Sequence, residues 1–297
     1  MRETRSDPGS GRGKLESRGW EPRTRRDGQA GSLVIVGTGL QAALHITPEA
    51  REEICHAERV FYLIPDPLSQ SWIKSLKPTA KSLASCYVSG RPRMAAYQRM
   101  IDRILAPVRS GRRVCVAFYG HPGVFVFPSH ECVRRAKEEG FEARMLPGIS
   151  AEDCLFSELG VDPARSGCQS YEATDFLVYR RKCDPSSALV LWQAGVVGNL
   201  RYGPRPSRSG LHVLARRLAR VYGKDHEVVL YEASLLPVLP STIRSTTIEE
   251  LPSAGVKGSM TLFVPPKARQ PDPQGLRQLG LRKSDLTVVP ACWKPGS

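Results

Sequence analysis

In the first half of the chain, short apolar segments typical of buried strands alternate with segments that have the hydrophobic periodicity of amphipathic helices. Strands are predicted at 32–36, 59–64, 113–118 and 141–146. Helices are predicted after Thr47 and at 92–109, 129–139 and 150–159. Because strands alternate with helices, we expect a mostly parallel α/β sheet.

The pattern changes after Asp162 and Pro163. Strands are then predicted at 188–193, 228–233, 242–248 and 260–264, with one clear helix at 211–222. Closely spaced strands favour a mixed sheet. The expected fold class is therefore α/β, with two α/β subdomains and a cleft between them, a first sheet that is mostly parallel and a second that is mixed. The expected boundaries are 1–30 for a disordered basic tail, 31–162 and 163–266 for the subdomains, and 267–297 for a Pro-rich, mostly unstructured tail.

The charge balance permits an anionic partner without pointing to one. The chain has 43 Lys and Arg against 29 Asp and Glu, a net charge of +14. The basic residues are dispersed, and most lie beside acidic residues or in loops, which favours a solvated surface over a nucleic-acid site. The sequence shows neither a signal peptide nor an apolar run of membrane-spanning length. We expect a cytoplasmic protein without membrane contact.

Several common kinds of site gain no support. The eight cysteines show no zinc-ligand spacing, so no metal site is expected. Gly37-Thr38-Gly39 is half of a dinucleotide fingerprint, but the third glycine is missing and the second strand ends in Ile64-Pro65 rather than at an acidic residue. Phosphate loops, nucleophile elbows and HExxH are also missing from the sequence.

Two loops rich in Gly and Pro follow neighbouring predicted strands. They are Tyr119–Gly123 and Pro147–Ala151, about thirty residues apart. In a parallel sheet both would lie at the carboxyl ends of strands, where ligands bind. Gly120 and Gly123 allow the backbone to approach a ligand, and a helix that begins near Ser150 offers amide donors. Local reasoning leaves open whether these are pocket walls or only tight turns.

Together, Gly37–Gly39, Tyr119–Gly123 and Pro147–Ala151 resemble motifs of the tetrapyrrole methylase superfamily, the class III S-adenosylmethionine-dependent methyltransferases. The longer stretches FYGHPGVFVFPSH, RMLPGISAEDCLF, GCQSYEATDFL and GSMTLFVPP resemble the borosin peptide backbone α-N-methyltransferases. The resemblance covers about residues 32–266, with its motifs in order. It implies a homodimer whose two subdomains enclose S-adenosylmethionine, which leaves as S-adenosylhomocysteine.

The resemblance also implies site residues. The cofactor-binding residues would be Tyr119, His121, Val124, Phe125, Ser150, Ala151, Gln193, Ala194 and Ser259. The chemistry would lie on Tyr87, Arg93 and Tyr97. Arg93 and Tyr97 are four residues apart, so they share a helix face. The alternative is that Tyr97, on the apolar stripe, is a core residue and that Arg93 is a solvated residue of the first turn.

The chain departs from the family in two places. The stretch Leu83–Tyr87 contains one tyrosine, whereas the fungal relatives carry several there. About thirty residues follow Pro266, without the pattern of a helical clasp, and Thr287–Ala291 is a weak candidate for a peptide that the enzyme methylates on itself. We therefore expect a split system in which the methyltransferase acts on backbone amides of a separate ribosomal precursor peptide.

Three alternatives remain open at this point. Within the superfamily, the chain could methylate carbon atoms of a tetrapyrrole such as a precorrin. In a different class, it could be a non-catalytic module that binds a peptide or a nucleotide. The net charge of +14 also allows RNA modification, although the dispersed basic residues favour it least.

Overall fold

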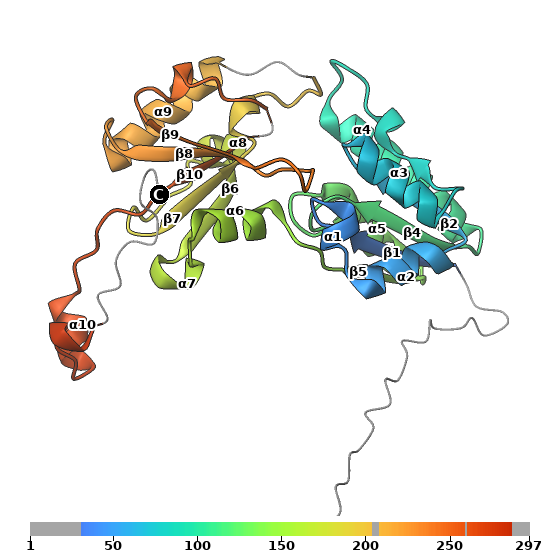
Figure 1. The fold of residues 1–297 in the computed structure, drawn as a ribbon, viewed down its shortest axis with the longest axis horizontal. Helices are drawn as coiled ribbons and strands as arrows, with labels where there is room; N and C mark the ends of the chain where they lie inside the picture. Colours follow the sequence, from blue (N-terminus) through green and yellow to red (C-terminus); the bar gives the residue numbers. More distant parts are fainter. Residues whose placement is uncertain (1–30, 204–207, 259, 287–297) are drawn as a thin grey trace, which may run out of the picture.

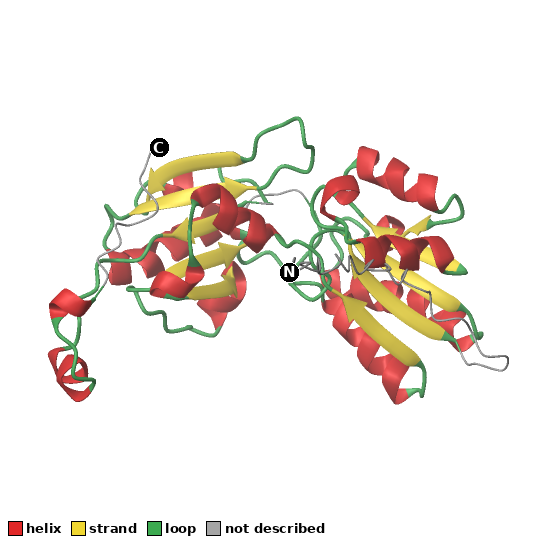
Figure 2. Ribbon diagram, turned by 60° about the horizontal axis from the view of Figure 1, so that its bottom comes forward, coloured by secondary structure: helices red, strands yellow, loops and turns green. Residues whose placement is uncertain are grey.

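A computed structural model of the protein describes residues 31–203, 208–258 and 260–286. The tail expected at 1–30, the stretch Thr287–Ala291 and the predicted cofactor residue Ser259 lie outside the described residues. The chain forms two subdomains that lie side by side (Figure 1, Figure 2).

The first subdomain is built on a five-stranded sheet in which every strand is parallel to its neighbours. The strand order is β3-β2-β4-β1-β5. The strands are β1 Ser32–Gly37, β2 Arg59–Leu63, β3 Lys81–Ser82, β4 Arg113–Phe118 and β5 Glu142–Leu146. The four predicted strands are confirmed. β3 was not predicted, because two residues carry no periodic signal.

Helices cover both faces of this sheet. They are α1 Ala42–His45, α2 Pro48–His56, α3 Pro67–Leu76, η1 Ala84–Cys86, α4 Arg93–Arg109 and α5 Phe127–Glu138. Residues of α2 and α3 pack on one face and residues of α4 and α5 on the other. Thr47 caps α2, as predicted, and its hydroxyl accepts a hydrogen bond from the amide of Ala50. Asp66 caps the unpredicted α3 in the same way.

The second subdomain contains a mixed sheet with strand order β6-β7-β10-β8-β9. The strands are β6 Cys168–Glu172, β7 Ala188–Trp192, β8 Glu227–Glu232, β9 Thr242–Thr247 and β10 Thr261–Val264. β6 runs parallel to β7, and the other pairs are antiparallel. The predicted fold class, with one parallel and one mixed sheet, is confirmed. β6 was not predicted, because its sequence, CQSYE, has no apolar run and no β-branched residue.

The helices of the second half are α6 Ala151–Leu159, α7 Pro163–Ser166, α8 Ala173–Val178, η2 Ala194–Val196, α9 Arg208–Tyr222, η3 Leu251–Ser253, α10 Pro273–Gln278 and η4 Lys283–Asp285. α8 and α9 pack on one face of the sheet and α6 on the other. α6 thus precedes the boundary expected at 162 but packs against the second sheet (Figure 1). Among the described helices, none is both long and apolar enough to cross a membrane.

Three glycines at the carboxyl ends of β1, β4 and β5 bring three loops into backbone contact. A Cβ added at Gly37 would lie 2.6 Å from the carbonyl oxygen of Gly120 and 2.8 Å from the Cα of Gly148. A Cβ added at Gly148 would meet the same carbonyl oxygen at 2.6 Å. Real Cβ atoms do not approach backbone this closely, so larger residues would push the loops apart.

We expect Gly148→Ala to lower the free energy of unfolding by about 2–3 kcal/mol, because overpacking against backbone cannot relax by side-chain rotation. Gly140→Ala is the matched control. Gly140 has φ +84° and open space around its Cβ position, so its substitution costs only the backbone strain of about 1 kcal/mol. Urea denaturation followed by circular dichroism measures both. Equal losses in the two variants would contradict the packing argument.

Candidate active site

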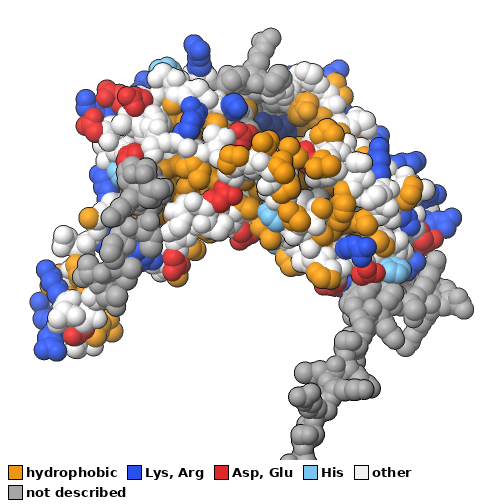
Figure 3. All heavy atoms as spheres, in the orientation of Figure 1, with side chains coloured by type: hydrophobic (Ala, Val, Ile, Leu, Met, Phe, Trp, Pro, Cys, Tyr) orange, Lys and Arg blue, Asp and Glu red, His pale blue; other side chains and the backbone are white. Residues whose placement is uncertain are grey.

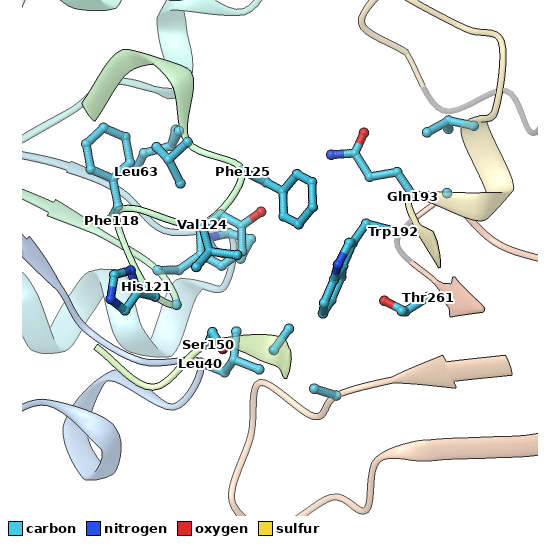
Figure 4. Close-up of a pocket in the computed structure, with 18 of the residues that line it drawn as sticks. Leu40, Leu63, Phe118, His121, Val124, Phe125, Ser150, Trp192, Gln193 and Thr261 are labelled. Atoms are coloured by element: carbon cyan, nitrogen blue, oxygen red, sulfur yellow. The ribbon is translucent and has the colours of Figure 1, made fainter. Parts of the chain in front are cut away.

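A cavity of about 650 Å³ lies between the two subdomains. Its first wall comes from the loops after β1, β4 and β5 and from the start of α4. Its second wall comes from the carboxyl ends of β7 and β8 and from the beginning of β10. Figure 4 shows Phe125 and Gln193 reaching toward each other from opposite walls. The volume is in the range of small-molecule sites.

The structure brings most of the predicted site residues together at this cavity. Those that line it are Tyr87, Arg93, Tyr97, Tyr119, His121, Val124, Phe125, Ser150, Ala151 and Gln193. Ala194 lies beside it, but the residue is fully buried and does not line the cavity. Whether these residues bind a cofactor or act in catalysis stays a prediction at this point.

Other lining residues were not predicted. They include Leu40, Trp192, Tyr202, Glu232, Ala233 and Thr261. Trp192 and Ala233 lie at the carboxyl ends of β7 and β8, so the strand-end rule, applied to the second sheet as well, would have found them. Tyr202 follows no predicted element, and the sequence holds no signal for it.

The loop after β4 is held by backbone hydrogen bonds. Gly39 and Gly120 exchange two of them, at N–O distances of 3.2 Å and 2.8 Å. His121 Nδ1 accepts a hydrogen bond of 2.9 Å from the amide of Gly123. This bond turns the chain and directs the next two residues, Val124 and Phe125, into the cavity (Figure 4).

Two residues in left-handed backbone conformations face each other across the cavity. Phe125 has φ +56° and Gln193 has φ +57°. For a residue with a Cβ, such strain costs about 1–3 kcal/mol, and it clusters at functional sites. The Phe125 ring lies 5.5 Å from the ring of Trp192, and Gln193 Oε1 accepts a 2.7 Å hydrogen bond from Arg93 Nη1. The contacts across the cavity therefore hold both strained residues.

The start of α6 is closed by its own side chains. Ser150 Oγ accepts from the amide of Asp153 at 3.1 Å, and the Asp153 carboxylate accepts from the Ser150 amide at 2.7 Å. This capping box uses two of the amide donors that we had expected to be available to a ligand. Ser150 and Ala151 can therefore contact a ligand chiefly through their remaining atoms.

Tyr87, Arg93 and Tyr97 form one end of the cavity. Tyr87 follows η1, Arg93 is the first residue of α4, and Tyr97 lies one turn later. The rings of Tyr87 and Tyr97 meet edge to face, with their centroids 6.4 Å apart. Tyr97 also packs against the core below α4, so it both lines the cavity and contributes to the core.

The aromatic end of the cavity is desolvated and carries one fixed cation. Burial raises the pKa of Tyr87, the neighbouring tyrosines add to the effect, and Arg93 opposes it. Burial also raises the pKa of Tyr119, because its hydroxyl is surrounded by protein although the residue is 44% exposed. Arg93 is the only Lys or Arg among the described lining residues, and it forms no ion pair with a described carboxylate.

The described residues hold no group of three or more His, Cys, Asp and Glu side chains placed to bind a metal. The lining of the cavity offers phenols, one guanidinium, one imidazole, one carboxylate, amide and hydroxyl groups, and aromatic faces. Such a set can stabilise developing negative charge on a ligand and can bind a flat or cationic group.

Comparison with known protein families assigns the chain to a family. Residues 32–252 match the family described as Tetrapyrrole (Corrin/Porphyrin) Methylases. The chain belongs to the tetrapyrrole methylase family. A solved member of the same fold, the uroporphyrin-III-C-methyltransferase from Thermus thermophilus, superposes with a TM-score of 0.56 at 21% identity. That comparison covers 85% of this chain and 97% of the solved one, and it shows the fold alone.

Relatives with higher identity within this family are fungal proteins. The methyltransferase/ribosomally synthesized cyclic peptide gymnopeptides precursor of Gymnopus fusipes is 42% identical over 86% of this chain and 63% of its own length. The corresponding omphalotin A precursor of Omphalotus olearius is 41% identical over 82% of this chain and 59% of its own. A type I borosin cyclic peptide precursor of Coprinopsis marcescibilis is 38% identical over 90% and 71%. The chain spans less than two thirds of the first two relatives.

The raised pKa of Tyr87 gives a stability prediction. Its folded pKa lies above the unfolded value of about 10, so the stability that it contributes is present below pH ~10 and is lost as pH rises further. We expect the free energy of unfolding to fall more steeply above pH ~10 in the native chain than in Tyr87→Phe. Urea midpoints measured across this range test it. Parallel curves for the two proteins would show that the Tyr87 phenol is not desolvated.

Proposed function

We propose that the chain is an S-adenosylmethionine-dependent methyltransferase that methylates backbone amide nitrogens of a ribosomal precursor peptide. The observation that carries the proposal is the cluster of Arg93, Tyr87 and Tyr97 at one end of a cavity whose remaining wall holds most of the predicted cofactor-binding residues. The fungal relatives, whose names join a methyltransferase to a cyclic peptide precursor, support the substrate class.

The cavity has the size and lining for the cofactor. Its volume of about 650 Å³ accommodates a folded nucleoside with an amino-acid tail. The rings of Phe125 and Trp192, 5.5 Å apart, offer faces that attract a cationic sulfonium. Val124, Ala151 and Thr261 provide small walls for the rest of the molecule. When bound there, S-adenosylmethionine would supply an electrophilic methyl group.

Arg93 addresses the weak nucleophilicity of an amide. The nitrogen lone pair is delocalised into the carbonyl group, and it becomes available as the N–H proton leaves and negative charge moves to the oxygen. Arg93 gives one N–H to Gln193 Oε1 at 2.7 Å, and a guanidinium has four further N–H donors. In this proposal Arg93 donates to the amide oxygen, a contribution of about 3 kcal/mol for a well-placed donor.

Tyr87 and Tyr97 have different roles in the removal of the amide proton. Because burial raises the pKa of Tyr87, its phenol stays protonated near neutral pH and acts as a hydrogen-bond donor. Tyr97, one turn beyond Arg93, then takes up the amide proton, directly or through water, while its own phenol proton passes to solvent. The reaction exchanges the amide proton for a methyl group and releases S-adenosylhomocysteine.

The same lining disfavours the tetrapyrrole alternative. A precorrin carries several carboxylates, which would need several cations to hold them. Within the described part of the cavity, Arg93 is the only Lys or Arg, and the Glu232 carboxylate adds negative charge. The aromatic wall suits an apolar peptide segment better than a polyanionic macrocycle.

We further propose that the precursor is a separate peptide and that the enzyme is a homodimer. Exposed leucines support a subunit contact, since Leu44 of α1 is 64% exposed and Leu68 of the adjoining α3 is 63% exposed. Figure 3 shows hydrophobic side chains gathered between the subdomains, with Lys and Arg toward the margins. Light scattering of the purified protein gives the oligomeric state directly.

The central test is mass spectrometry after incubation with S-adenosylmethionine. We expect a synthetic apolar peptide, supplied in trans, to gain mass in steps of one methyl group, located on backbone nitrogens by fragmentation. The intact mass of the protein is followed in the same sample, because a gain there would mean that the chain methylates itself. No gain on either, with S-adenosylhomocysteine binding intact in calorimetry, would leave a non-catalytic binding module.

Arg93→Ala separates chemistry from cofactor binding. We expect kcat to fall about 100-fold, because an oxyanion donor acts mainly in the transition state, while calorimetry shows little change in affinity for S-adenosylhomocysteine. Arg91→Ala is the matched control. Arg91 is exposed, lies two residues earlier and does not line the cavity, so its loss should leave kcat unchanged. A similar fall of kcat in both variants would contradict the proposed role of Arg93.

A further inference from the structure

A short segment of the second subdomain, residues 199–203, crosses to the first subdomain at the end of the cavity that holds Arg93. We call it the strap. Its backbone pairs with the chain before α4: the amide of Arg93 donates to Leu200 at 3.2 Å, and the amide of Tyr202 donates to Arg91 at 3.0 Å. Gly90 donates to the Tyr202 carbonyl at 2.9 Å. The strap is therefore a fixed element of the described structure.

The pairing fixes the register of the strap. Pro92 and Arg201 face each other as an antiparallel pair, and Arg201 Nη1 also donates to the carbonyl of Gly90 at 2.8 Å. Tyr202 lines the cavity, whereas Arg201 and Leu200 do not.

The Tyr202 ring extends the aromatic end of the cavity. It stacks on Tyr87 with centroids 4.4 Å apart and an angle of 19° between the rings, and Tyr87 in turn meets Tyr97 edge to face. Three tyrosines thus form a continuous wall beside Arg93, and the outermost one comes from the other subdomain. Tyr202 is 43% exposed, so one side of its ring remains available for contact.

We propose that Tyr202 is a specificity-determining residue that packs against the side chain next to the methylated amide and selects apolar side chains there. This inference rests on the proposed function. A stacked pair of tyrosines gives a flat apolar surface on which an aliphatic side chain can pack. Arg93 lies beside this wall without a carboxylate partner among the described residues, so a lysine in the substrate would also meet a like charge.

The experiment compares two fluorescein-labelled synthetic peptides, one of valine, isoleucine and glycine flanked by glutamates, the other with a central valine replaced by lysine. Fluorescence anisotropy in saturating S-adenosylhomocysteine measures binding without turnover, and methyl transfer gives kcat and KM. We expect Tyr202→Ala to weaken binding of the apolar peptide and raise its KM about tenfold, with kcat little changed. The preference for the apolar over the lysine peptide should shrink.

Tyr202→Phe and Leu200→Ala are the matched variants. Tyr202→Phe keeps the ring and should restore binding, whereas a purely structural role of the hydroxyl would not allow that rescue. Leu200 is 70% exposed on the same strap and contributes its carbonyl to the pairing, so Leu200→Ala should behave as the native chain. Calorimetry with S-adenosylhomocysteine and thermal unfolding confirm that each variant is folded.

The outcomes separate this inference from the proposed function. If the native chain transfers methyl groups but Tyr202→Ala binds the apolar peptide as tightly as before, the role of Tyr202 is wrong and the function stands. If the peptide binds in a Tyr202-dependent way but is never methylated, the function is wrong and the contact stands. If the native chain neither binds nor methylates the apolar peptide, both are overturned.

Discussion

The structure depends on one close contact, in which the backbones of Gly37, Gly120 and Gly148 touch at the carboxyl ends of three parallel strands. The parallel sheet brings these strand ends to a common edge, and the lack of side chains lets the loops merge into one wall. Gly39 and Gly120 then lock the wall through paired hydrogen bonds. The positions of His121, Val124 and Phe125 in the cavity follow from this contact, since they belong to the same loop.

The opposite wall is held to the first one by contacts between side chains and by the backbone pairing of the strap with the chain at the start of α4. The Arg93–Gln193 hydrogen bond and the Phe125–Trp192 ring contact both cross the cavity. Each of these contacts includes one residue in a left-handed backbone conformation, Phe125 or Gln193, which costs free energy. The site is therefore formed jointly by the two subdomains.

The sequence predicted the two-sheet fold and much of the cavity for identifiable reasons. Buried strands and amphipathic helices produce recognisable hydrophobic patterns in the sequence, and the Gly/Pro loops mark strand ends. β3 and β6 produced no such pattern, because the first has two residues and the second has no apolar run and no β-branched residue. Tyr202 could not be found, since its place depends on pairing between residues about one hundred positions apart. The prediction that the start of α6 offers free amide donors was partly wrong, because the Asp153 carboxylate accepts the hydrogen bond of the Ser150 amide.

The pairing of the strap with the chain before α4 also bears on how such a protein can diversify. The group around Arg93 and the ring of Tyr202 are adjacent in space but encoded far apart, on separate subdomains. Side-chain changes at 199–203 can therefore accumulate while the backbone pairing with the start of the helix that carries Arg93 and Tyr97 is kept. Under the proposed function, reactivity is inherited with one half of the chain, while the choice of substrate can change with the other.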